Sequence, residues 1–271
     1  MNVLVICNKF PYPPTDGGQI ATFAMIRGMA EAGHSVTVAA INTQKHFYDV
    51  SKLPESVRSM ADFRSVFINT DLTVSGTLSN FLFSRLPYTA TRFISQDFSD
   101  LLRQVLHEKE FDIVQLEGLY LCSYIPLIHE CSQAKIAYRA HNVEFEIWKR
   151  LANETKNIAK RLYLRNLAKR VERFEKSILN QYDCLIPITQ RDGETYNRLG
   201  NVKPQFVAPT GIFVNDLPQK VAEKEKSVSL FHIGALDWTP NQQGLQWFLA
   251  NCWQEIRRQN PEIQLFVAGR N

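Results

Sequence analysis

The chain has 271 residues, of which 45% are hydrophobic and 21% charged, a composition typical of a globular protein with a sizeable core. Its formal net charge of +4 is too small to indicate a nucleic-acid-binding protein. Its five cysteines, an odd number without CxxC or metal-ligand spacing, indicate free thiols in a reducing compartment. No apolar run approaches the roughly 18 residues of a membrane span, and no signal peptide precedes the first apolar segment. We therefore expect a cytoplasmic protein.

Residues 1–41 predict a single βαβ unit. Residues 3–6 (VLVI) form a short apolar run, typical of a parallel strand buried on both faces. A helical stripe at spacings of three and four follows and ends at Gly33, a residue favoured just after a helix. The stripe consists of Ile20, Phe23, Ile26 and Ala30. Residues 36–41 supply a second apolar strand, so the unit indicates a parallel sheet.

The loop of this unit, residues 8–18 (NKFPYPPTDGG), is rich in proline and glycine. Gly17 and Gly18 lie where the helix begins, and glycines there let backbone N–H groups approach an anion. The loop matches neither GxGxxG nor GxxxxGK[ST], which argues against a dinucleotide-binding oxidoreductase and a Walker-type phosphate site. Two interpretations stay open, a phosphate or diphosphate contact at Gly18 and an ordinary turn.

Further apolar runs and helical stripes continue the α/β pattern to about residue 208. Strands are expected around residues 66–68, 113–116, 136–140, 184–188 and 205–208, and helices around residues 98–106, 119–131, 143–182 and 190–199. Residues 42–61 predict an irregular segment, and residues 72–91 a loop with a short helix. Pro187 argues against a fully hydrogen-bonded central strand at 184–188.

Two strands are followed by polar residues with chemical potential. Glu117 follows the strand 113–116, and His141, Asn142 and Glu144 follow the strand 136–140. Open α/β sheets bind their ligands at the carboxyl ends of the strands. Both segments are therefore candidate site residues.

A strongly basic segment occupies residues 149–176, with ten Lys or Arg against three Glu. Such a run is most often a solvated helix face. Nucleic acid is disfavoured because few aromatic residues are interleaved and no known module is present. An anionic membrane surface is the remaining alternative, since each basic residue there contributes about 1 kcal/mol.

Residues 215–227 have one proline, six charges and no periodicity, as expected of a linker between domains. A strand at 229–233, a helix at 245–258 and a strand at 264–268 follow. One βαβ unit is too small to bury its own sheet, so we expect the chain to stop inside a second Rossmann-like domain. The predicted organisation is an N-terminal domain over 1–214, a linker over 215–227 and the start of a second domain over 228–271.

Taken in order, these segments resemble the family 4 glycosyltransferases of GT-B architecture. The motifs that carry the resemblance are PPTDGG and EAGHSVTV near the start, HNVE at 141–144, APTG at 208–211, and HIGALDWTPN and VAGRN in the last 40 residues. The resemblance implies an α/β fold of two Rossmann-like domains, with the active site in the cleft between them.

The resemblance also implies an activity, the transfer of a hexose or other sugar from a nucleoside diphosphate sugar to an acceptor. Transfer would proceed with retention of anomeric configuration and without a metal or other cofactor. The first domain would hold a glycan or lipid-linked acceptor and the second the nucleotide. A role in polysaccharide biosynthesis at the inner face of the membrane follows, and this chain alone is expected to be inactive.

Carried over residue by residue, the resemblance assigns roles to the motifs. Gly17, Gly18 and Gly234 would contact the donor diphosphate. His141 would lie under the transferred sugar, with the simple alternative of a first-turn helix residue bonded to backbone. Thr210 and Gly211 replace the Asn-Gly that the family has before its hinge.

The remaining candidates contact acceptor or sugar hydroxyls in this interpretation. They are Glu117, Asn142 and Glu144. Glu117 can equally cap the following helix, and Glu144 can equally be a first-turn acid that favours the helix dipole.

The chain departs from the family at the diphosphate clamp. Ala235 occupies the place of an arginine, and the stretch through Gln242 contains no lysine. A second function therefore stays open, a catalytically silent GT-B relative that binds a nucleotide sugar or a partner protein.

Overall fold

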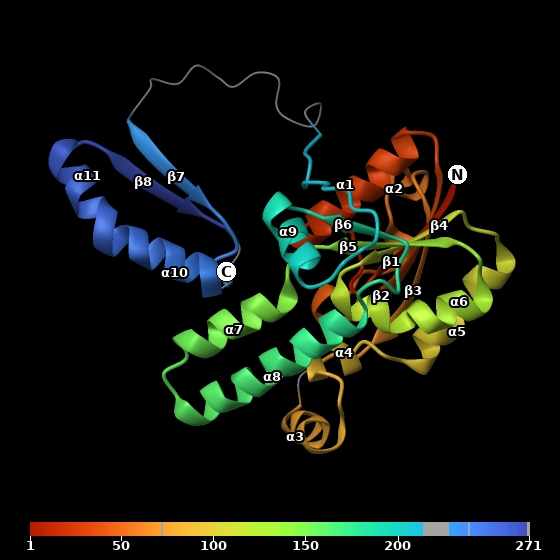
Figure 1. The fold of residues 1–271 in the computed structure, drawn as a ribbon. Coiled ribbons are helices and arrows are strands. Elements are labelled where there is room, and N and C mark those ends of the chain that lie inside the picture. The colour runs from red at the N-terminus through yellow and green to blue at the C-terminus, as the bar shows by residue number, and fades with distance from the viewer. Residues whose placement is uncertain (72, 214–227, 238, 270–271) are drawn as a thin grey trace. The chain divides into compact units, whose positions relative to one another are not determined.

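The computed structural model describes residues 1–71, 73–213, 228–237 and 239–269 (Figure 1). The chain divides into two compact units, of which the first is Met1–Ile212. The second contains the elements from Ser229 onward. The linker expected over 215–227 lies outside the described residues. Within the described ranges, none of the helices is long and apolar enough to span a bilayer.

The first unit is built on a six-stranded sheet in the order β3-β2-β1-β4-β5-β6. Every neighbouring pair of its strands is parallel. The strands are β1 (Asn2–Cys7), β2 (Ser35–Thr43), β3 (Asp62–Ile68), β4 (Ile113–Glu117), β5 (Lys135–Ala140) and β6 (Cys184–Pro187). This is the doubly wound order expected of a Rossmann-like domain, in which β2 and β3 are added on one side of β1 and β4, β5 and β6 on the other.

The connections between these strands are mainly helical. The α-helices are α1 (Gly17–Glu31), α2 (Glu55–Arg58), α3 (Val74–Phe83), α4 (Tyr88–Thr91), α5 (Gln96–Glu108), α6 (Ile125–Cys131), α7 (Glu144–Glu154), α8 (Ile158–Ser177) and α9 (Gln190–Arg198). Short 3₁₀ turns are η1 (Gln44–His46), η2 (Val50–Lys52) and η3 (Leu119–Tyr124). The segment 42–61, predicted as irregular, thus contains three short helical turns, and 72–91 contains α3 and α4.

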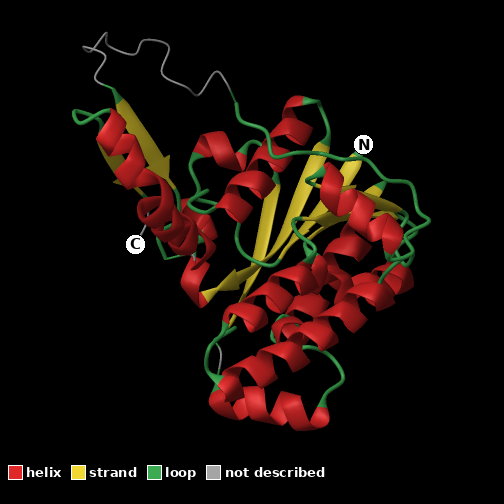
Figure 2. Ribbon diagram, turned by 60° about the vertical axis from the view of Figure 1, so that its left-hand side comes forward, coloured by secondary structure: helices red, strands yellow, loops and turns green. Residues whose placement is uncertain are grey.

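The sheet separates two hydrophobic cores, because successive side chains of a strand point to opposite faces. Leu4 and Ile6 of β1 belong to the core that α5, α6 and α8 cover. Val3 and Val5 belong to the other, which α1 and α2 cover. Figure 2 shows helices on both faces of the sheet. Burial on both faces explains why the strands are recognisable as continuous apolar runs.

One predicted strand is wrong. Residues 205–208 run beside β6 but form only a single bridge, between Leu185 and Gln205. The N–H groups of Phe206 and Ala208 donate to the carbonyls of Leu185 and Pro187, at 3.0 and 2.9 Å. Pro187 has no N–H to donate in return, so the ladder does not continue.

The second unit is a βαβ arrangement in which β7 (Ser229–Ile233) and β8 (Gln264–Ala268) pair in parallel. Between them lie α10 (Thr239–Phe248), the π-helical turn η5 (Leu249–Trp253) and α11 (Gln254–Gln259). Both strands were predicted with these bounds, and the helix begins six residues before the predicted Leu245.

Candidate active site

The carboxyl ends of β1, β4 and β5 meet at one edge of the sheet. Cys7 pairs in register with Glu117, and Glu117 pairs with Arg139. His141 follows β5 directly. The structure therefore brings together the two polar segments that were predicted at separate strand ends.

Glu117 is the centre of this edge. Its side chain is only 2% exposed, yet both carboxylate oxygens have donors. Oε2 accepts hydrogen bonds from Thr22 Oγ1 at 2.9 Å and from an Arg139 guanidinium nitrogen at 3.0 Å, and it lies 2.7 Å from His141 Nε2. The side-chain amide of Gln115 donates to Oε1. These donors satisfy a carboxylate that would otherwise be costly to bury.

The pKa of Glu117 reflects this environment. Burial alone would raise it, but the hydrogen bond with His141 and the positive charge of Arg139 outweigh burial and lower the pKa from 4.5 to about 2. Glu117 is therefore a carboxylate at neutral pH and can only accept hydrogen bonds. It follows that His141 donates from Nε2, which leaves Nδ1 as the nitrogen directed away from Glu117.

Arg139 is a charged residue inside an otherwise apolar strand, and its side chain is 1% exposed. Besides Glu117, its guanidinium donates to the Ala21 carbonyl of α1 at 3.2 Å. Thr22, the next residue of α1, contacts the same carboxylate. The helix that begins at Gly17 is thus tied to the strand that ends before His141, and neither Arg139 nor Thr22 was among the predicted site residues.

The loop over residues 8–18 is held in place by polar contacts. The buried Gln19 side chain donates to the Phe10 carbonyl at 2.9 Å and accepts from the Thr15 hydroxyl at 2.9 Å. Asp16 is the N-cap of α1 and accepts from the Gln19 N–H at 2.9 Å. Lys9 forms an ion pair with Asp16 at 2.6 Å. Burial would raise the pKa of Asp16, but the hydrogen bond from Lys9 prevails and lowers it.

Gly17 and Gly18 occupy the first turn of α1, where backbone N–H groups lack acceptors within the helix. A Cβ added to Gly17 would meet nothing within 4 Å. One added to Gly18 would lie 3.0 Å from Lys9 Nζ, so this ammonium group lies against the glycine. The predicted anion contact thus has a cation beside it, which the motif alone did not indicate.

The turn after His141 is held from a distance by Glu175 of α8. Its carboxylate accepts from the N–H groups of Glu144 and Phe145, the first residues of α7, at 3.2 and 3.1 Å. The Tyr196 hydroxyl donates to the same carboxylate and also lies 3.2 Å from the Asn142 carbonyl. Burial raises the pKa of Glu175 to about 7, although these donors partly offset it. Glu175 therefore caps α7 and fixes the turn.

Asn142 and Glu144 differ in their surroundings. The Asn142 side chain is exposed beside the half-buried His141. The Glu144 carboxylate accepts from the Tyr120 hydroxyl at 3.0 Å, and burial raises its pKa. Asn142 is thus accessible to a ligand, although its side chain also hydrogen-bonds the Glu144 carboxylate.

The other predicted residues follow β6 or lie in the second unit: the segment before Thr210 runs parallel to β6 up to the end of that strand, where the Ala208 N–H donates to the Pro187 carbonyl. Thr210 and Gly211 are exposed near the end of the first unit. Gly234 follows β7, and its N–H donates to the Ala268 carbonyl at 3.1 Å. A Cβ added to Gly269 would lie 1.7 Å from the Gly234 carbonyl oxygen, so the two backbones meet at the ends of β7 and β8 with no room for a side chain.

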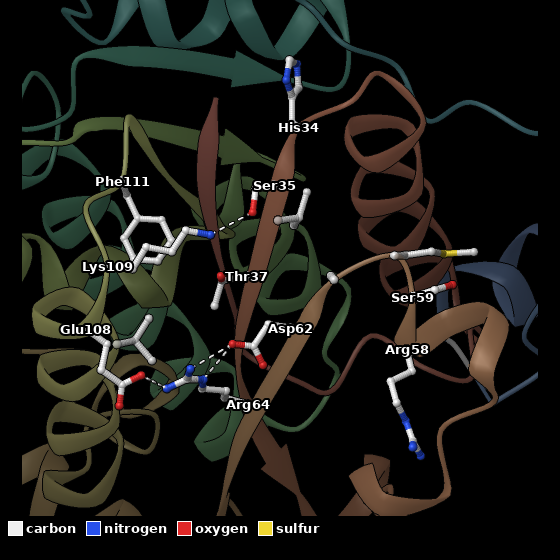
Figure 3. Close-up of a pocket in the computed structure, with 14 residues that line it drawn as sticks. His34, Ser35, Thr37, Arg58, Ser59, Asp62, Arg64, Glu108, Lys109 and Phe111 are labelled. Atoms are coloured by element: carbon white, nitrogen blue, oxygen red, sulfur yellow. Dashed lines mark hydrogen bonds and ion pairs between the residues drawn. The ribbon is translucent and has the colours of Figure 1, made fainter.

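A pocket of about 600 Å³ lies at the opposite, amino-terminal edge of β2 and β3 (Figure 3). Its charged groups are partnered. Arg64 pairs with Asp62 at 3.0 Å and also with Glu108, and Lys109 donates to the Ser35 hydroxyl at 2.8 Å. We therefore assign these residues to the stability of this edge. Across the described residues, no group of three or more His, Cys, Asp or Glu is placed to hold a metal ion.

Comparison with protein families found no family model that matches the chain. An uncharacterized 44.6 kDa protein in the cps region of Klebsiella pneumoniae is 23% identical over 267 residues. The alignment covers 98% of this chain and 64% of that protein. The chain thus spans just under two thirds of the length of this relative.

Solved structures share the fold. HepE of Anabaena in complex with UDP has a TM-score of 0.54 at 11% identity, with 100% of this chain and 70% of HepE covered. Sucrose-phosphate synthase of Thermosynechococcus elongatus has a TM-score of 0.61 at 14% identity, with 98% of this chain and 62% of the synthase covered. The lipopolysaccharide outer core galactosyltransferase WaaB has a TM-score of 0.51 at 13% identity, with 100% of this chain and 68% of WaaB covered. The chain has the GT-B type of fold, as its motifs predicted.

The burial of Glu117 generates a prediction about stability. Glu117→Gln should lower the free energy of unfolding at pH 7 by about 3–5 kcal/mol, because Arg139 would keep its charge without a buried partner. The folded-state pKa of Glu117 lies below its ordinary value, so its stabilisation is present above pH 4.5 and is lost as the pH falls towards 2. Urea unfolding at pH 7 and pH 3 should therefore show a smaller difference between wild type and variant at pH 3.

His141→Ala is the matched control, since it leaves the pair of Glu117 and Arg139 intact. Its loss of stability should be the smaller of the two. A Glu117→Gln protein within about 1 kcal/mol of wild type at pH 7 would contradict the ion-pair account.

Proposed function

We propose that the complete protein transfers a sugar from a nucleoside diphosphate sugar to a glycan or lipid-linked acceptor. The observation that carries this proposal is the His141 side chain, held by the buried Glu117 carboxylate at the carboxyl edge of the sheet. The GT-B type of fold supports it, as do neighbours solved with UDP or named as a galactosyltransferase. In this proposal the first unit is the acceptor side and the second belongs to the nucleotide side.

His141 has the chemistry required next to a reacting sugar. With Nε2–H donated to Glu117, the Nδ1 nitrogen is available to accept a hydrogen bond from a sugar hydroxyl. Positive charge develops on the sugar ring as the diphosphate departs. A histidine coupled to a buried carboxylate can stabilise that charge without having to reorganise. Glu117, which was predicted to contact the acceptor, is assigned instead to orienting His141, because its carboxylate is buried and its donors are protein groups.

The first turn of α1 is the proposed contact for the donor diphosphate. The N–H groups of Gly17 and Gly18 and the helix dipole favour an anion there. Thr22 joins the same helix to Glu117 at 2.9 Å. The diphosphate contact and His141 therefore belong to one connected set of residues. Asn142 is proposed to contact sugar hydroxyls.

Three further features of the proposal come from the resemblance. They are retention of anomeric configuration, independence of metal ions, and additional donor or hinge contacts from Gly234, Thr210, Gly211 and Glu144. Proton NMR of the product tests the stereochemistry. An inverted anomer would contradict retention and would assign Nδ1 of His141 the role of general base for the acceptor hydroxyl.

The alternative function is a catalytically silent relative that binds a nucleotide sugar or a partner protein. It is favoured by one observation, the absence of the expected cations after Gly234, where Ala235 stands in place of arginine. Lys9, which pairs with Asp16, lies against Gly18 and places an ammonium group beside the proposed diphosphate contact of the first unit. Turnover of a nucleotide sugar therefore separates the two functions, because binding of a nucleotide sugar alone is compatible with both.

The test is turnover of the complete protein with UDP-, GDP- and ADP-sugars. We expect nucleotide release with at least one donor, and a decrease of about 10²-fold or more in His141→Ala with little change in melting temperature. A folded wild-type protein that is inactive across the panel would favour the silent relative. An unchanged rate in His141→Ala would remove His141 from the mechanism.

We also propose that the protein acts at the inner, anionic face of the cytoplasmic membrane through residues 149–176. In the structure Lys149 and Lys176 pair with Glu172, and Arg170 is buried. Apart from Lys149 and Lys176, the exposed basic residues of this segment are Arg150, Lys156, Lys160, Arg165, Lys169 and Arg173. Six exposed cations on one helical hairpin are enough to respond to a negative surface potential.

Co-sedimentation with vesicles tests this part of the proposal. Retention on vesicles rich in phosphatidylserine should decrease as salt rises from 20 to 500 mM, roughly the range over which surface charges become screened. Neutral phosphatidylcholine vesicles are the control. If retention on anionic vesicles is no greater than on neutral ones at low salt, the segment is only a solvated face.

A further inference from the structure

A pocket of about 410 Å³ lies between α3 and α8, and it is lined by Arg85, Arg170 and Arg173. We call it the α3–α8 pocket. The Phe81 ring of α3 packs against the Tyr163 ring of α8, with the ring centroids 6.3 Å apart. Among the described residues that line the pocket, none is acidic. Three guanidinium groups thus share one cavity that contains no carboxylate.

The three arginines do not have the same role. Arg170 is only 8% exposed and holds the end of α3. Its guanidinium donates to the Asn80 side-chain oxygen at 3.2 Å and to the Asn80 carbonyl at 3.0 Å, and also to the Ser84 carbonyl. Burial lowers the pKa of Arg170, and the positive charge of Arg173 lowers it further. Arg170 therefore builds the pocket while being repelled by a neighbouring cation.

Arg85 and Arg173 are both exposed, and neither has an ion-pair or hydrogen-bond partner among the residues that the structure describes. Arg173 lies one turn from Arg170 on α8, and Arg85 lies two residues after the end of α3. Asn166, one turn earlier on α8, also lines the pocket and adds a side-chain amide. Planar guanidinium groups that converge without a carboxylate form the usual recognition site for the oxygens of a phosphate.

We propose that the α3–α8 pocket binds a phosphate group, with Arg85 and Arg173 as its charged ligands and Asn166 as a hydrogen-bond donor. The inference goes beyond the proposed glycosyl transfer, because none of the residues at the carboxyl edge of the sheet takes part in it, and it deepens the proposed membrane contact, to which Arg173 also belongs. The group is a phosphomonoester or diphosphate, which a soluble compound or a lipid headgroup can carry.

The surroundings of the pocket favour a phosphate that is carried by a lipid. Phe81 lines the pocket and is 43% exposed. Leu162, one turn before Asn166 on the same face of α8, is 60% exposed, and Phe83 at the end of α3 is 85% exposed. Exposed apolar side chains beside unpaired cations match a phosphate headgroup with the beginning of its acyl chains.

Isothermal titration calorimetry with two probes tests the proposal. The probes are inorganic pyrophosphate and dihexanoyl phosphatidic acid below its micelle concentration, and dihexanoyl phosphatidylcholine is the neutral control. We expect both anions to bind the wild-type protein. In the double variant Arg85→Gln/Arg173→Gln both affinities should fall at least about tenfold, because two charge-assisted contacts are lost. Both side chains are exposed, so the variant should remain folded.

The matched control is Lys156→Gln/Lys160→Gln, which removes two positive charges from the same helical hairpin outside the pocket. This variant should lower the affinity for either anion by less than about twofold. Equal losses of affinity in the two double variants would show that the anions bind by diffuse charge, and would overturn the proposal that the pocket binds phosphate. The absence of binding to the wild-type protein would overturn it as well.

Phe81→Ser separates the two sources of phosphate. This substitution should lower the affinity for dihexanoyl phosphatidic acid and leave the affinity for pyrophosphate unchanged. If the affinity for the lipid is also unchanged, the assignment to a lipid headgroup is overturned, and the pocket is a site for soluble phosphates.

Discussion

The burial of one carboxylate, Glu117, is the constraint on which the site depends. Ionised groups are expensive to remove from water, and this one remains charged because its neighbours compensate it. Arg139 neutralises it from the next strand, Thr22 reaches it from α1, and His141 completes the set. Since each partner comes from a different element, the ion pair specifies how α1, β4 and β5 meet. The edge of the sheet that carries the candidate chemistry is thus also an edge that the fold holds rigidly.

A second buried carboxylate, that of Glu175, fixes the turn that follows His141. Glu175 accepts from the first two N–H groups of α7, so the turn between β5 and α7 is anchored at both ends. The imidazole is therefore presented by a short, fixed segment. Such pre-organisation is what charge stabilisation in a transition state requires.

Much of the fold could be predicted because the strands of a parallel sheet covered on both faces are continuous apolar runs in the sequence. The apolar runs at 3–6, 113–116 and 136–140 all became strands. The run at 205–208 did not become one, because it lies beside Pro187, and pairing depends on the neighbour as well as on the run itself. The short helices between 42 and 91 have no strong periodicity, so their positions required the tertiary structure.

The candidate site was predictable only where it follows from topology. His141 and Glu117 were identified because polar residues at strand ends converge in any open parallel sheet. Their direct contact, and the burial of Glu117, depend on Arg139 and Thr22, which are 22 and 95 residues from Glu117 in the chain. A lone arginine in an apolar strand signals a buried partner but does not say which one. Lys9 and Glu175 have no local signal of this kind, because their roles arise from packing alone.

In the proposed site a charged Glu117 holds the proton of His141 on Nε2 and leaves Nδ1 free for a ligand. The most direct measurement is nitrogen-15 NMR of the His141 ring in the folded protein, at a pH where the imidazole is neutral. The account predicts the tautomer with Nε2 protonated and Nδ1 unprotonated, and the loss of that preference in Glu117→Gln. A neutral imidazole protonated on Nδ1 in the wild-type protein would contradict it.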